Sequence, residues 1–397
     1  MGLSFELSPE QAAIRQASRE FASQVVAPQA ADWDQREAFP YPLVAQMAEL
    51  GLFGLPYPES VGGAGADFVS YLVALEEIAR ADAALAITME AAVSLGIAPI
   101  FHYGSEEQKQ RYLPDLCAGR KLWAFGLTEP EAGSDAGGTK TRARRDGEQW
   151  LVDGTKCFIT NAGTDISAGV TITAITGNEG RRKQISAFLV ERGTPGFEVG
   201  PPYRKLGWHA SDTRELNFAG CPVPAANVLG KEGGGLGQFF KTLEAGRVAI
   251  AALAVGVAQA CLDASLSYSQ QRRQFGRAIS QFQATQMKLA DMATQIELSR
   301  LMVWRAGALI DLGQPAAQFA AMAKLQASET ATWCANQAVQ IHGGAGFMED
   351  LPVARYYRDV KINEIGEGTS EIQRLMIASH LLGLGGSVSR LMEEDHS

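Results

Sequence analysis

Cysteine is scarce in this sequence, and basic residues are outnumbered by acidic ones. The 397 residues include 5 cysteines, with no Cys-x-x-Cys pair. This pattern favours reduced thiols in a cytosol-like compartment over a disulfide scaffold. The 35 basic residues stand against 44 acidic ones, a balance that argues against non-specific nucleic-acid binding. His209 and His342 each lack a second histidine at ligand spacing, so we expect no metal.

Signals for export and for membrane insertion are also absent. The N-terminus has no basic segment followed by an apolar run, and Glu6 and Glu10 are atypical of a transit peptide. No stretch of 18 or more residues is free of charged and strongly polar groups, so no membrane span is expected. We expect a cytoplasmic bacterial protein, or a mitochondrial matrix protein if the chain is a processed eukaryotic form.

The composition indicates a folded protein of more than one domain. Hydrophobic residues make up 46% of the chain and charged residues 20%, as in ordinary globular proteins. A single core stops growing at about 250–300 residues, so two or three domains are expected. The patterns run helices, strands, helices, which predicts an α+β fold with an N-terminal helical domain over 1–122, a middle β-domain over 123–234 and a C-terminal helical domain over 235–397.

The first domain begins with a helix-start signal. Ser8 is placed as the N-cap, Pro9 as the first helical residue and Gln11 as its capping-box partner. A second helical pattern runs from Phe68 to Ala98 and is broken by Gly96 and Pro99.

The middle region contains short β-rich runs too closely spaced for βαβ crossovers. An antiparallel sheet or small barrel is therefore predicted. Turns are expected at Asp146-Gly147, Asp153-Gly154 and Gly177-Asn178. The predicted strands are Trp123–Leu127, Thr139–Ala143, Trp150–Val152, Phe158–Thr160, Val170–Ile175, Ile185–Val190 and Glu215–Phe218.

The last region contains three long amphipathic helical patterns, Leu243–Gln271, Phe282–Leu312 and Pro315–Ile341. Apolar helices of this length often find burial against other subunits. The glycine run 233–237 lacks the GxGxxG spacing of a nucleotide fold and is interpreted as a turn leading into a helix.

Two segments of the β-region carry groups that could bind a ligand. Residues 125–135 (Phe-Gly-Leu-Thr-Glu-Pro-Glu-Ala-Gly-Ser-Asp) end a strand in a loop of hydroxyls and small residues, suited to a planar heteroaromatic ring or a phosphate. Residues 156–161 place an aromatic ring beside a hydroxyl on a second strand. An ordinary turn and an ordinary sheet position explain these segments equally simply.

Two segments of the C-terminal region stand out in the same way. Residues 340–347 close a helix with three glycines, which form either a C-cap or, since a cap needs fewer, a point of close approach to a ligand or another chain. In 365–373, Ser370 and Gln373 have capping-box spacing, and Glu367 precedes them between two glycines. Glu367 is either a carboxylate favoured by the helix N-terminus or an unshielded base.

In their order and separations these segments resemble the acyl-CoA dehydrogenase family, over nearly the whole chain. The run 127–135 (Leu-Thr-Glu-Pro…Gly-Ser-Asp) resembles its first signature, and 271–276 (Gln-Arg-Arg-Gln-Phe-Gly) with Gln283 resembles its second. The run 367–373 (Glu-Gly-Thr-Ser-Glu-Ile-Gln) resembles its active-site segment. The sequence is most similar to the short-chain, butyryl-type branch.

The resemblance implies a C-terminal four-helix-type bundle, a homotetramer and FAD. Residues implied to bind the cofactor of their own subunit are Phe125, Leu127, Thr128, Ser134, Phe158, Ile159, Thr160, Thr369, Ser370 and Glu371. Residues implied to reach the cofactor of a neighbouring subunit are Arg272, Phe275, Gln283, Gln340, Ile341, His342, Gly343 and Gly344. Residues implied to lie at the substrate are Ser134, Glu244, Gly246, Arg247, Gly366 and Gly368.

The resemblance also implies the reaction, the α,β-dehydrogenation of a short acyl-CoA to a trans-2-enoyl-CoA. Glu367 would take the α-proton, and flavin N5 would accept the β-hydride. Some members carry the base immediately before Arg247, but Gly246 occupies that position here. A tyrosine is common where Gly366 stands, so a pocket that admits branched groups is expected. Electron-transferring flavoprotein would be the acceptor, in fatty acid or branched amino-acid catabolism.

Other functions of the same architecture stay open at the sequence level. An oxidase would pass the electrons to oxygen, and a non-catalytic homologue would only bind acyl-CoA. Glu367 and Arg247 argue against the non-catalytic reading. A flavin-dependent hydroxylase would not need Glu367, and a glutaryl-type enzyme would need a pocket arginine, which 82–100 lacks.

Overall fold

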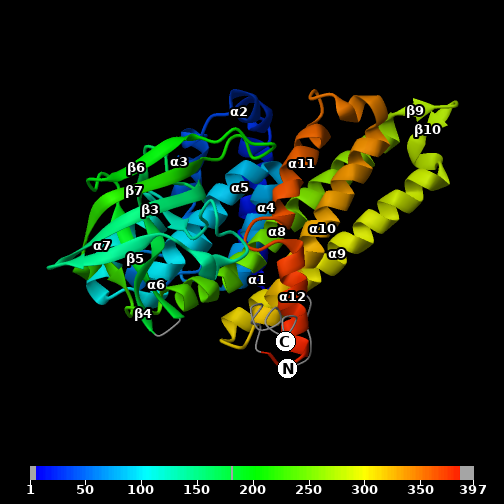
Figure 1. Cartoon of the computed structure of the whole chain (residues 1–397). Helices are drawn as coiled ribbons and strands as arrows, with labels where there is room; N and C mark the ends of the chain where they lie inside the picture. Colours follow the sequence, from blue (N-terminus) through cyan, green and yellow to red (C-terminus); the bar gives the residue numbers. More distant parts are fainter. Residues whose placement is uncertain (1–5, 180–181, 385–397) are drawn as a thin grey trace.

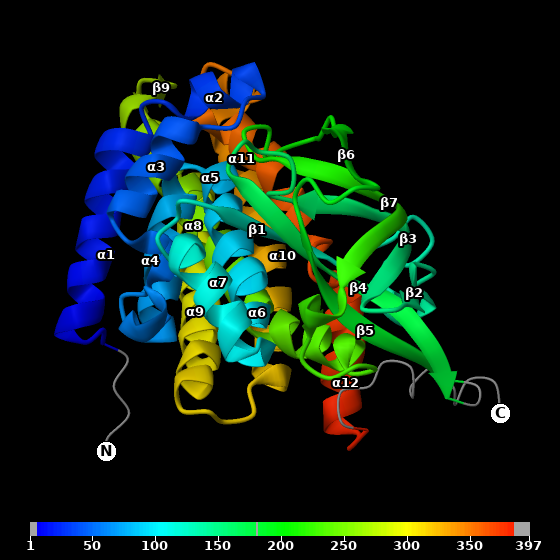
Figure 2. The ribbon, with the colours of Figure 1, turned by 90° about the vertical axis from the view of Figure 1, so that its left-hand side faces the viewer.

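Helices from both ends of the chain pack together beside a single large sheet. The computed structural model describes residues 6–179 and 182–384. The strands of this large sheet occupy one side of the molecule in Figure 1, and the quarter-turn in Figure 2 keeps them to one side of the helices. The predicted α+β order of helices, strands and helices is confirmed.

The N-terminal helices begin as the sequence predicts. The hydroxyl of Ser8 accepts from the Gln11 backbone N–H at 3.2 Å, and the Gln11 side chain accepts from the Ser8 N–H at 2.9 Å, with Pro9 as the first helical residue. The helices are α1 (Pro9–Phe21), α2 (Ala30–Arg36), α3 (Tyr41–Glu49), α4 (Phe68–Ala81), α5 (Ala83–Glu90), α6 (Ala98–Tyr103) and α7 (Glu106–Cys117), with π-helical turns at Ala22–Val26 and Ala91–Ile97.

The predicted helix from Phe68 to Ala98 is divided, and its break lies elsewhere than predicted. Asp82 ends α4 in an extended conformation, and its carboxylate accepts from the Leu85 N–H at 2.7 Å to cap α5. Gly96 instead lies inside the π-helical turn. A Cβ there would lie 2.3 Å from the Trp123 carbonyl oxygen, so the glycine permits close packing against the sheet.

The sheet is antiparallel apart from the pairing of β4 with β1 and, at one residue pair, with β2. Its order is β6-β7-β3-β2-β4-β5-β8, and β1 pairs in parallel with β4. The strands are β1 (Leu122–Gly126), β2 (Arg142–Asp146), β3 (Gln149–Thr160), β4 (Ser167–Glu179), β5 (Arg182–Glu191), β6 (Phe197–Pro202), β7 (Thr213–Pro224) and β8 (Val228–Leu229).

Two of the three turns predicted in this region are wrong. Asp153 and Gly154 lie within β3, where the register with β7 shifts between Val152 and Gly154. This shift is a β-bulge, which uses the same glycine conformations as a turn. Gly177 and Asn178 lie within β4 and pair with β5. Pattern alone does not distinguish a bulge from a reversal of the chain.

The strand predicted over Thr139–Ala143 begins only at Arg142, because the preceding backbone binds a carboxylate. Glu129 accepts from the backbone N–H groups of Lys140 at 2.6 Å and Thr141 at 3.2 Å. It also accepts from the Thr139 hydroxyl. These contacts divert the segment from the sheet.

The three long C-terminal helices that the sequence pattern predicts are confirmed. The helices of this region are α8 (Gly235–Gln271), α9 (Gln283–Asp311), α10 (Ala317–His342), α11 (Pro352–Val360) and α12 (Ser370–Leu381). Helix α8 begins earlier than the sequence pattern predicts, and α9 and α10 match their predicted bounds within two residues. Helices α8, α9 and α10 pack on one another, and α12 packs on α10. A short hairpin of β9 (Arg273–Gln274) and β10 (Arg277–Ala278) joins α8 to α9. The part of the predicted C-terminal domain over 385–397 lies outside the described residues.

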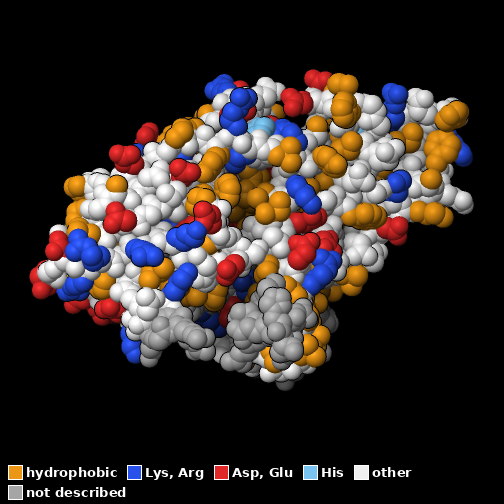
Figure 3. Space-filling model, in the orientation of Figure 1, with side chains coloured by type: hydrophobic (Ala, Val, Ile, Leu, Met, Phe, Trp, Pro, Cys, Tyr) orange, Lys and Arg blue, Asp and Glu red, His pale blue; other side chains and the backbone are white. Residues whose placement is uncertain are grey.

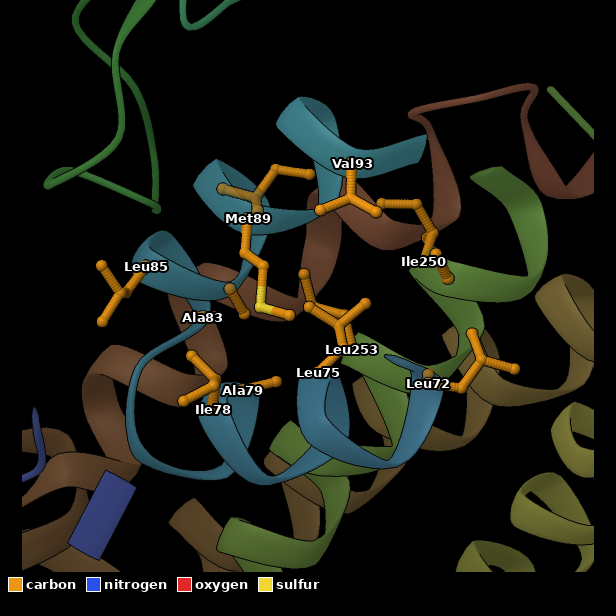
Figure 4. Close-up of a cluster of buried hydrophobic side chains, with 14 of the residues drawn as sticks. Leu72, Leu75, Ile78, Ala79, Ala83, Leu85, Met89, Val93, Ile250 and Leu253 are labelled. Atoms are coloured by element: carbon orange, nitrogen blue, oxygen red, sulfur yellow. The ribbon is translucent and has the colours of Figure 1, made fainter. Parts of the chain in front are cut away.

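The largest core joins the N-terminal helices to α8. Leu75 and Ile78 of α4, Met89 of α5 and Leu253 of α8 point toward one another (Figure 4) and are buried. Burying one such side chain contributes about 1.5–3 kcal/mol. Two helical runs, Ala83–Tyr103 and Gly235–Gln271, are long and apolar enough to cross a membrane, but 89% and 83% of their most apolar windows are buried inside the protein. Burial in this core explains their composition.

Candidate active site

Glu367 has an unusual backbone conformation in the segment that leads into α12. Its φ is +55°, a left-handed value rare outside glycine, and that of Gly368 is +97°. Thr369 then caps α12, and its side chain accepts from the Ile372 N–H at 3.3 Å. The predicted capping box with Ser370 as N-cap is therefore wrong by one residue. Ser370 is instead the first residue of the helix.

Three side chains from three helices hold this left-handed segment. The Gln373 amide of α12 donates to the carbonyl oxygens of Glu367 at 3.2 Å and Gly368 at 2.9 Å. Arg247 of α8 donates to the Glu367 carbonyl at 3.3 Å, and Lys324 of α10 donates to the Gly368 carbonyl at 2.7 Å. These contacts offset strain of about 1–3 kcal/mol at a left-handed residue.

The Glu367 carboxylate is buried without a partner of good geometry, although the residue as a whole is half-buried. Neither carboxylate oxygen meets a donor of good geometry within the described chain, and the neighbouring side chain is the buried carboxyl group of Glu90 in α5. Burial raises its pKa to about 7, while the charges of Arg247 and Lys324 act in the opposite direction. Burial also lowers the pKa of Lys324 to about 8. A carboxyl group that titrates near neutrality in a cleft is suited to proton transfer.

Four of the predicted substrate residues, Gly246, Arg247, Gly366 and Gly368, lie beside this carboxylate. Ser134 is exposed in the loop after β1. Gly246 and Arg247 are on the face of α8 turned toward Glu367. Glu244, one turn earlier, is half-buried and pairs with Lys241 at 2.6 Å. Around Gly366, an added Cβ would meet only the Ile362 carbonyl oxygen, at an ordinary 3.5 Å.

The end of β1 lies on the same face of α8. The ring of Phe125 stacks on Phe239 of α8 with centroids 4.0 Å apart. Phe239 and Gly246 are seven residues, or two helical turns, apart and so share one face, about 10 Å apart along the axis. The loop that follows, with Leu127 and Thr128, therefore begins about two helical turns along α8 from Gly246, which faces Glu367.

The end of β3 lies beside this loop, because the Cys157 N–H donates to the Thr128 carbonyl at 2.9 Å. Phe158 has a φ of +62°, and its ring is 66% exposed beside Tyr203. The side chain of Ile159 is buried in the sheet, so only its backbone can meet a ligand. Beyond Thr160, the Asn161 amide donates to the carbonyl of Thr88 in α5 at 2.9 Å.

Polar groups in this region are free to bind a planar ring. The hydroxyls of Thr128, Thr160 and Ser134 make no hydrogen bond within the described residues, and Thr128 and Thr160 are half-buried. The buried Ser370 hydroxyl likewise has no partner there. Hydrophobic side chains gather in a recess between the sheet and the helices (Figure 3). Unpaired hydroxyls beside an exposed aromatic ring fit a flavin.

A buried ion pair supports the loop, and the sequence analysis did not identify it. Lys156 of β3 donates to the Glu129 carboxylate at 2.7 Å, and both side chains are almost fully buried. The ammonium group, with the Thr139 and Thr141 groups, lowers the pKa of Glu129 to about 2 against the effect of burial. Glu129 thereby fixes the loop that carries Thr128.

The second set of predicted cofactor residues lies at the other end of the helical bundle. Arg272, Phe275 and Gln283 are exposed around the β9–β10 hairpin, and Phe275 is 93% exposed. His342, at the end of α10, stacks on Tyr268 of α8 beside this hairpin, with centroids 4.3 Å apart.

The residues at the end of α10 present mainly polar and backbone groups at this second position. Gln340, Gly343 and Gly344 are exposed, whereas Ile341 is buried in the core. His342 follows Lys324 by 18 residues of α10, so these two residues lie about 27 Å apart along the helix. One chain therefore does not bring both sets of residues together (Figure 1).

Three residues at the site were missed or misread in the sequence. Lys324 and Glu90 lie inside apolar helical patterns, and Gln373 was interpreted as a capping residue. Their only sequence signal is a polar side chain on a buried helix face. Within 6–179 and 182–384, no group of three or more His, Cys, Asp or Glu residues could hold a metal ion. A surface pocket of about 560 Å³, lined by Tyr41, Val44 and Ile166, does not include Glu367.

Family models match almost the whole chain in the same order as these elements. They are the N-terminal domain of acyl-CoA dehydrogenase over residues 8–120, the middle domain over 124–221 and the C-terminal domain over 233–382. The chain belongs to the acyl-CoA dehydrogenase family. This family consists of FAD-dependent oxidoreductases that act on the CH–CH group of acyl-CoA thioesters.

Relatives within the acyl-CoA dehydrogenase family agree with the short-chain branch. A probable acyl-CoA dehydrogenase of Bacillus subtilis is 50% identical over 381 residues, 96% of this chain and 100% of the relative. The mitochondrial short-chain specific acyl-CoA dehydrogenase of Mus musculus is 45% identical, over 96% of this chain and 92% of the relative. The solved butyryl-CoA dehydrogenase of Megasphaera elsdenii has a TM-score of 0.93 at 40% identity, over 96% of this chain and all of its own.

Proposed function

We propose that the protein is an FAD-dependent dehydrogenase of short acyl-CoA thioesters, with Glu367 as the base. The observation that carries this proposal is the buried, unpaired carboxylate of Glu367 on a left-handed segment fixed by Arg247, Lys324 and Gln373. Because its pKa is raised toward neutrality, this carboxyl group can take a proton from a weak carbon acid and release it later.

The backbone of Glu367 offers the second group that the reaction needs. Its N–H donates no hydrogen bond to any described residue. A donor aimed at the thioester oxygen stabilises the negative charge that develops there as the α-proton leaves. Because the N–H donor and the carboxylate base belong to the same residue, a thioester bound to the N–H has its α-carbon held beside the carboxylate.

The flavin position follows from the two loops of the β-domain. We assign the hydrogen bonds to the ring to Thr128 and Thr160, and the aromatic wall to Phe158, with Phe125, Leu127 and the Ile159 backbone beside them. Ser134, Thr369, Ser370 and Glu371 would hold the remainder of the cofactor of their own subunit. Bound FAD supplies the hydride acceptor.

We infer that FAD is completed by a second copy of the chain. His342 lies about 27 Å along α10 from Lys324, which binds the segment of Glu367. Arg272, Phe275, Gln283 and residues 340–344, at the His342 end, would therefore serve the cofactor of a neighbouring subunit. Apolar side chains cluster at the hairpin end in Figure 3, as expected for a surface that another subunit covers. A homotetramer in which pairs of chains share these contacts fits this arrangement.

The acyl group that we propose is short and branched. Gly366 leaves the space beside the base open, and Gly246 and Gly368 line the same segment. The proposed electron acceptor is electron-transferring flavoprotein. We place the protein in a bacterial cytoplasm or a mitochondrial matrix; its relatives include bacterial proteins and proteins named as mitochondrial.

Anaerobic mixing of the purified holoenzyme with a panel of acyl-CoAs tests the proposal. Bleaching of the flavin absorbance by a short acyl-CoA, with formation of the 2-enoyl-CoA, is the expected result. If no short acyl-CoA bleaches a fully loaded flavin, the proposed function is wrong. Peroxide released at the rate of turnover in air would instead indicate an oxidase.

A further inference from the structure

A second buried carboxyl group lies beside Glu367 and has no part in the function proposed above. Glu90 is the last residue of α5, and its exposed fraction is 0%. Its carboxyl group lies within hydrogen-bonding reach of the Glu367 carboxyl group. None of the four oxygens meets another donor at good hydrogen-bond geometry within the described chain.

Two such groups cannot both be ionised at this separation. Like charges in a buried site repel, so a pair of carboxyl groups retains one proton between them. A shared proton also satisfies oxygen atoms whose only other nearby donor is the Ser94 hydroxyl beside Glu90. A buried polar atom that lacks a hydrogen-bond partner reduces the stability of the fold by about 1–3 kcal/mol.

The surrounding charges decide which group keeps the proton. The cations Arg247 of α8 and Lys324 of α10 face Glu367 and favour its ionised form. No cation is among the groups that face Glu90. The acidic groups Glu244, Glu364 and Glu371 face these two cations rather than the carboxyl pair.

The remaining neighbours of Glu90 are neutral. The Tyr71 hydroxyl of α4 shares a hydrogen bond with Ser94 at 3.0 Å, and the Tyr57 hydroxyl donates to the Val93 carbonyl at 2.6 Å. Burial raises the pKa of both phenols well above the usual value, so they carry no charge near neutrality. The surroundings of Glu90 are therefore less charged than those of Glu367.

We propose that Glu90 is a positioning residue for the base: its protonated carboxyl group donates a hydrogen bond to the Glu367 carboxylate and holds it ionised in the resting enzyme. This inference rests on the proposed function of Glu367. Transfer of the α-proton breaks a C–H bond and forms an O–H bond on Glu367. Glu90 and Glu367 then carry one proton each, so the buried pair is neutral and its negative charge is removed.

The pH dependence of flavin reduction in three variants of the holoenzyme tests this inference. Glu90→Gln keeps a donor, so the midpoint of the bleaching rate with butyryl-CoA should stay close to the wild-type midpoint. Glu90→Leu removes the donor that favours the ionised base, so its midpoint should rise by about one pH unit. Thr88→Val, buried on the same helix, controls for packing and should leave the midpoint unchanged. A Glu90→Leu profile that coincides with wild type would overturn the inference.

Infrared difference spectra of the substrate-free holoenzyme provide a second test that needs no turnover. At pH 8, wild type minus Glu90→Gln should contain the carbonyl band of a protonated carboxylic acid. A difference with only carboxylate bands would show that Glu90 is ionised and would refute the proposal even if Glu90→Leu fails to fold. If no acyl-CoA bleaches the flavin, the proposed function fails, while this spectrum still decides the state of Glu90.

Discussion

Gly246 of α8 faces the carboxylate of Glu367 so closely that no other residue type fits between them. A Cβ on Gly246 would lie 2.3 Å from Glu367 Oε2 and 3.0 Å from its Cδ. Glycine in the middle of a helix costs about 0.5–1 kcal/mol relative to alanine. The helix accepts this cost at the point where the proposed base needs room. A side chain at position 246 would therefore occupy the same volume as the Glu367 carboxylate, so only one of the two positions can carry a carboxylate there.

Replacing Gly246 by alanine should displace the base while the fold persists. We expect the rate of flavin reduction by butyryl-CoA to fall at least about tenfold, because small misplacements of a reacting group are costly. Gly237→Ala is a matched control in the same helix, since a Cβ there meets nothing within 4 Å. Anaerobic stopped-flow measurement of both variants decides the matter. An unchanged rate in Gly246→Ala would contradict the inferred geometry.

Replacing Glu367 by glutamine should abolish proton abstraction and leave substrate binding intact. The amide keeps the size of the carboxyl group but cannot take a proton, so we expect a loss of at least about two orders of magnitude in flavin bleaching. Acyl-CoA binding, followed by the shift of the flavin spectrum, should persist. Near-wild-type bleaching would move the base to another residue, with Glu244 the next candidate.

The same variant should raise stability in a pH-dependent way. The folded-state pKa of Glu367, about 7, lies above its ordinary value of 4.5. The folded state therefore binds the proton more tightly, and stability is lost as pH rises from 4.5 through 7. Glu367→Gln removes this loss, on the order of 3 kcal/mol at pH 8. Thermal unfolding should show a higher Tm than wild type at pH 8 and a similar Tm at pH 5. Equal differences at both pH values would show that the carboxyl group is not destabilised by burial.

Local signals in the sequence predicted the elements that depend only on neighbouring residues. The capping box of Ser8 and Gln11 needs only the first turn of the helix and no partner elsewhere, and it was correct. The turn expected at Asp153-Gly154 failed because a bulge between β3 and β7 depends on the partner strand. The cap of α12 shifted from Ser370 to Thr369, since both are hydroxyl residues and only the backbone geometry distinguishes them.

Only those residues of the site that lie in a contiguous sequence motif could be predicted from the sequence. Glu367 could be identified because its flanking glycines and the helix start lie next to it in the sequence. Lys324 and Glu90 come from helices far away in the chain and reach Glu367 only through the packing of α5, α8 and α10. Their roles depend on burial and on neighbouring charges, which no local pattern encodes. The predicted roles of the cofactor residues remain predictions.

The hairpin end of the bundle should be needed for assembly and for retention of FAD. Phe275 is 93% exposed in the single chain, so Phe275→Ser should cost little in the folding of one subunit but weaken an interface that covers it. Light scattering should show smaller oligomers, and the flavin-to-protein ratio should fall. Leu50→Ser, at 49% exposure on the end of α3, is the control. A tetramer with full flavin occupancy in Phe275→Ser would show that this ring does not serve the interface.

The space beside Gly366 should set the preference for branched substrates. A Cβ at this position meets only the Ile362 carbonyl at 3.5 Å, so no neighbouring side chain occupies the start of the space that a tyrosine would fill. The missing phenol ring corresponds to on the order of 100 Å³. Gly366→Tyr should therefore lower kcat/KM for isobutyryl-CoA and 2-methylbutyryl-CoA more than for butyryl-CoA. It should also stiffen the segment that carries Glu367, so kcat on the linear substrate should hold or rise. Steady-state kinetics on the three thioesters give the branched-to-linear ratio. The same ratio in wild type and Gly366→Tyr would mean that another side chain bounds the acyl group, and the wide pocket would be wrong.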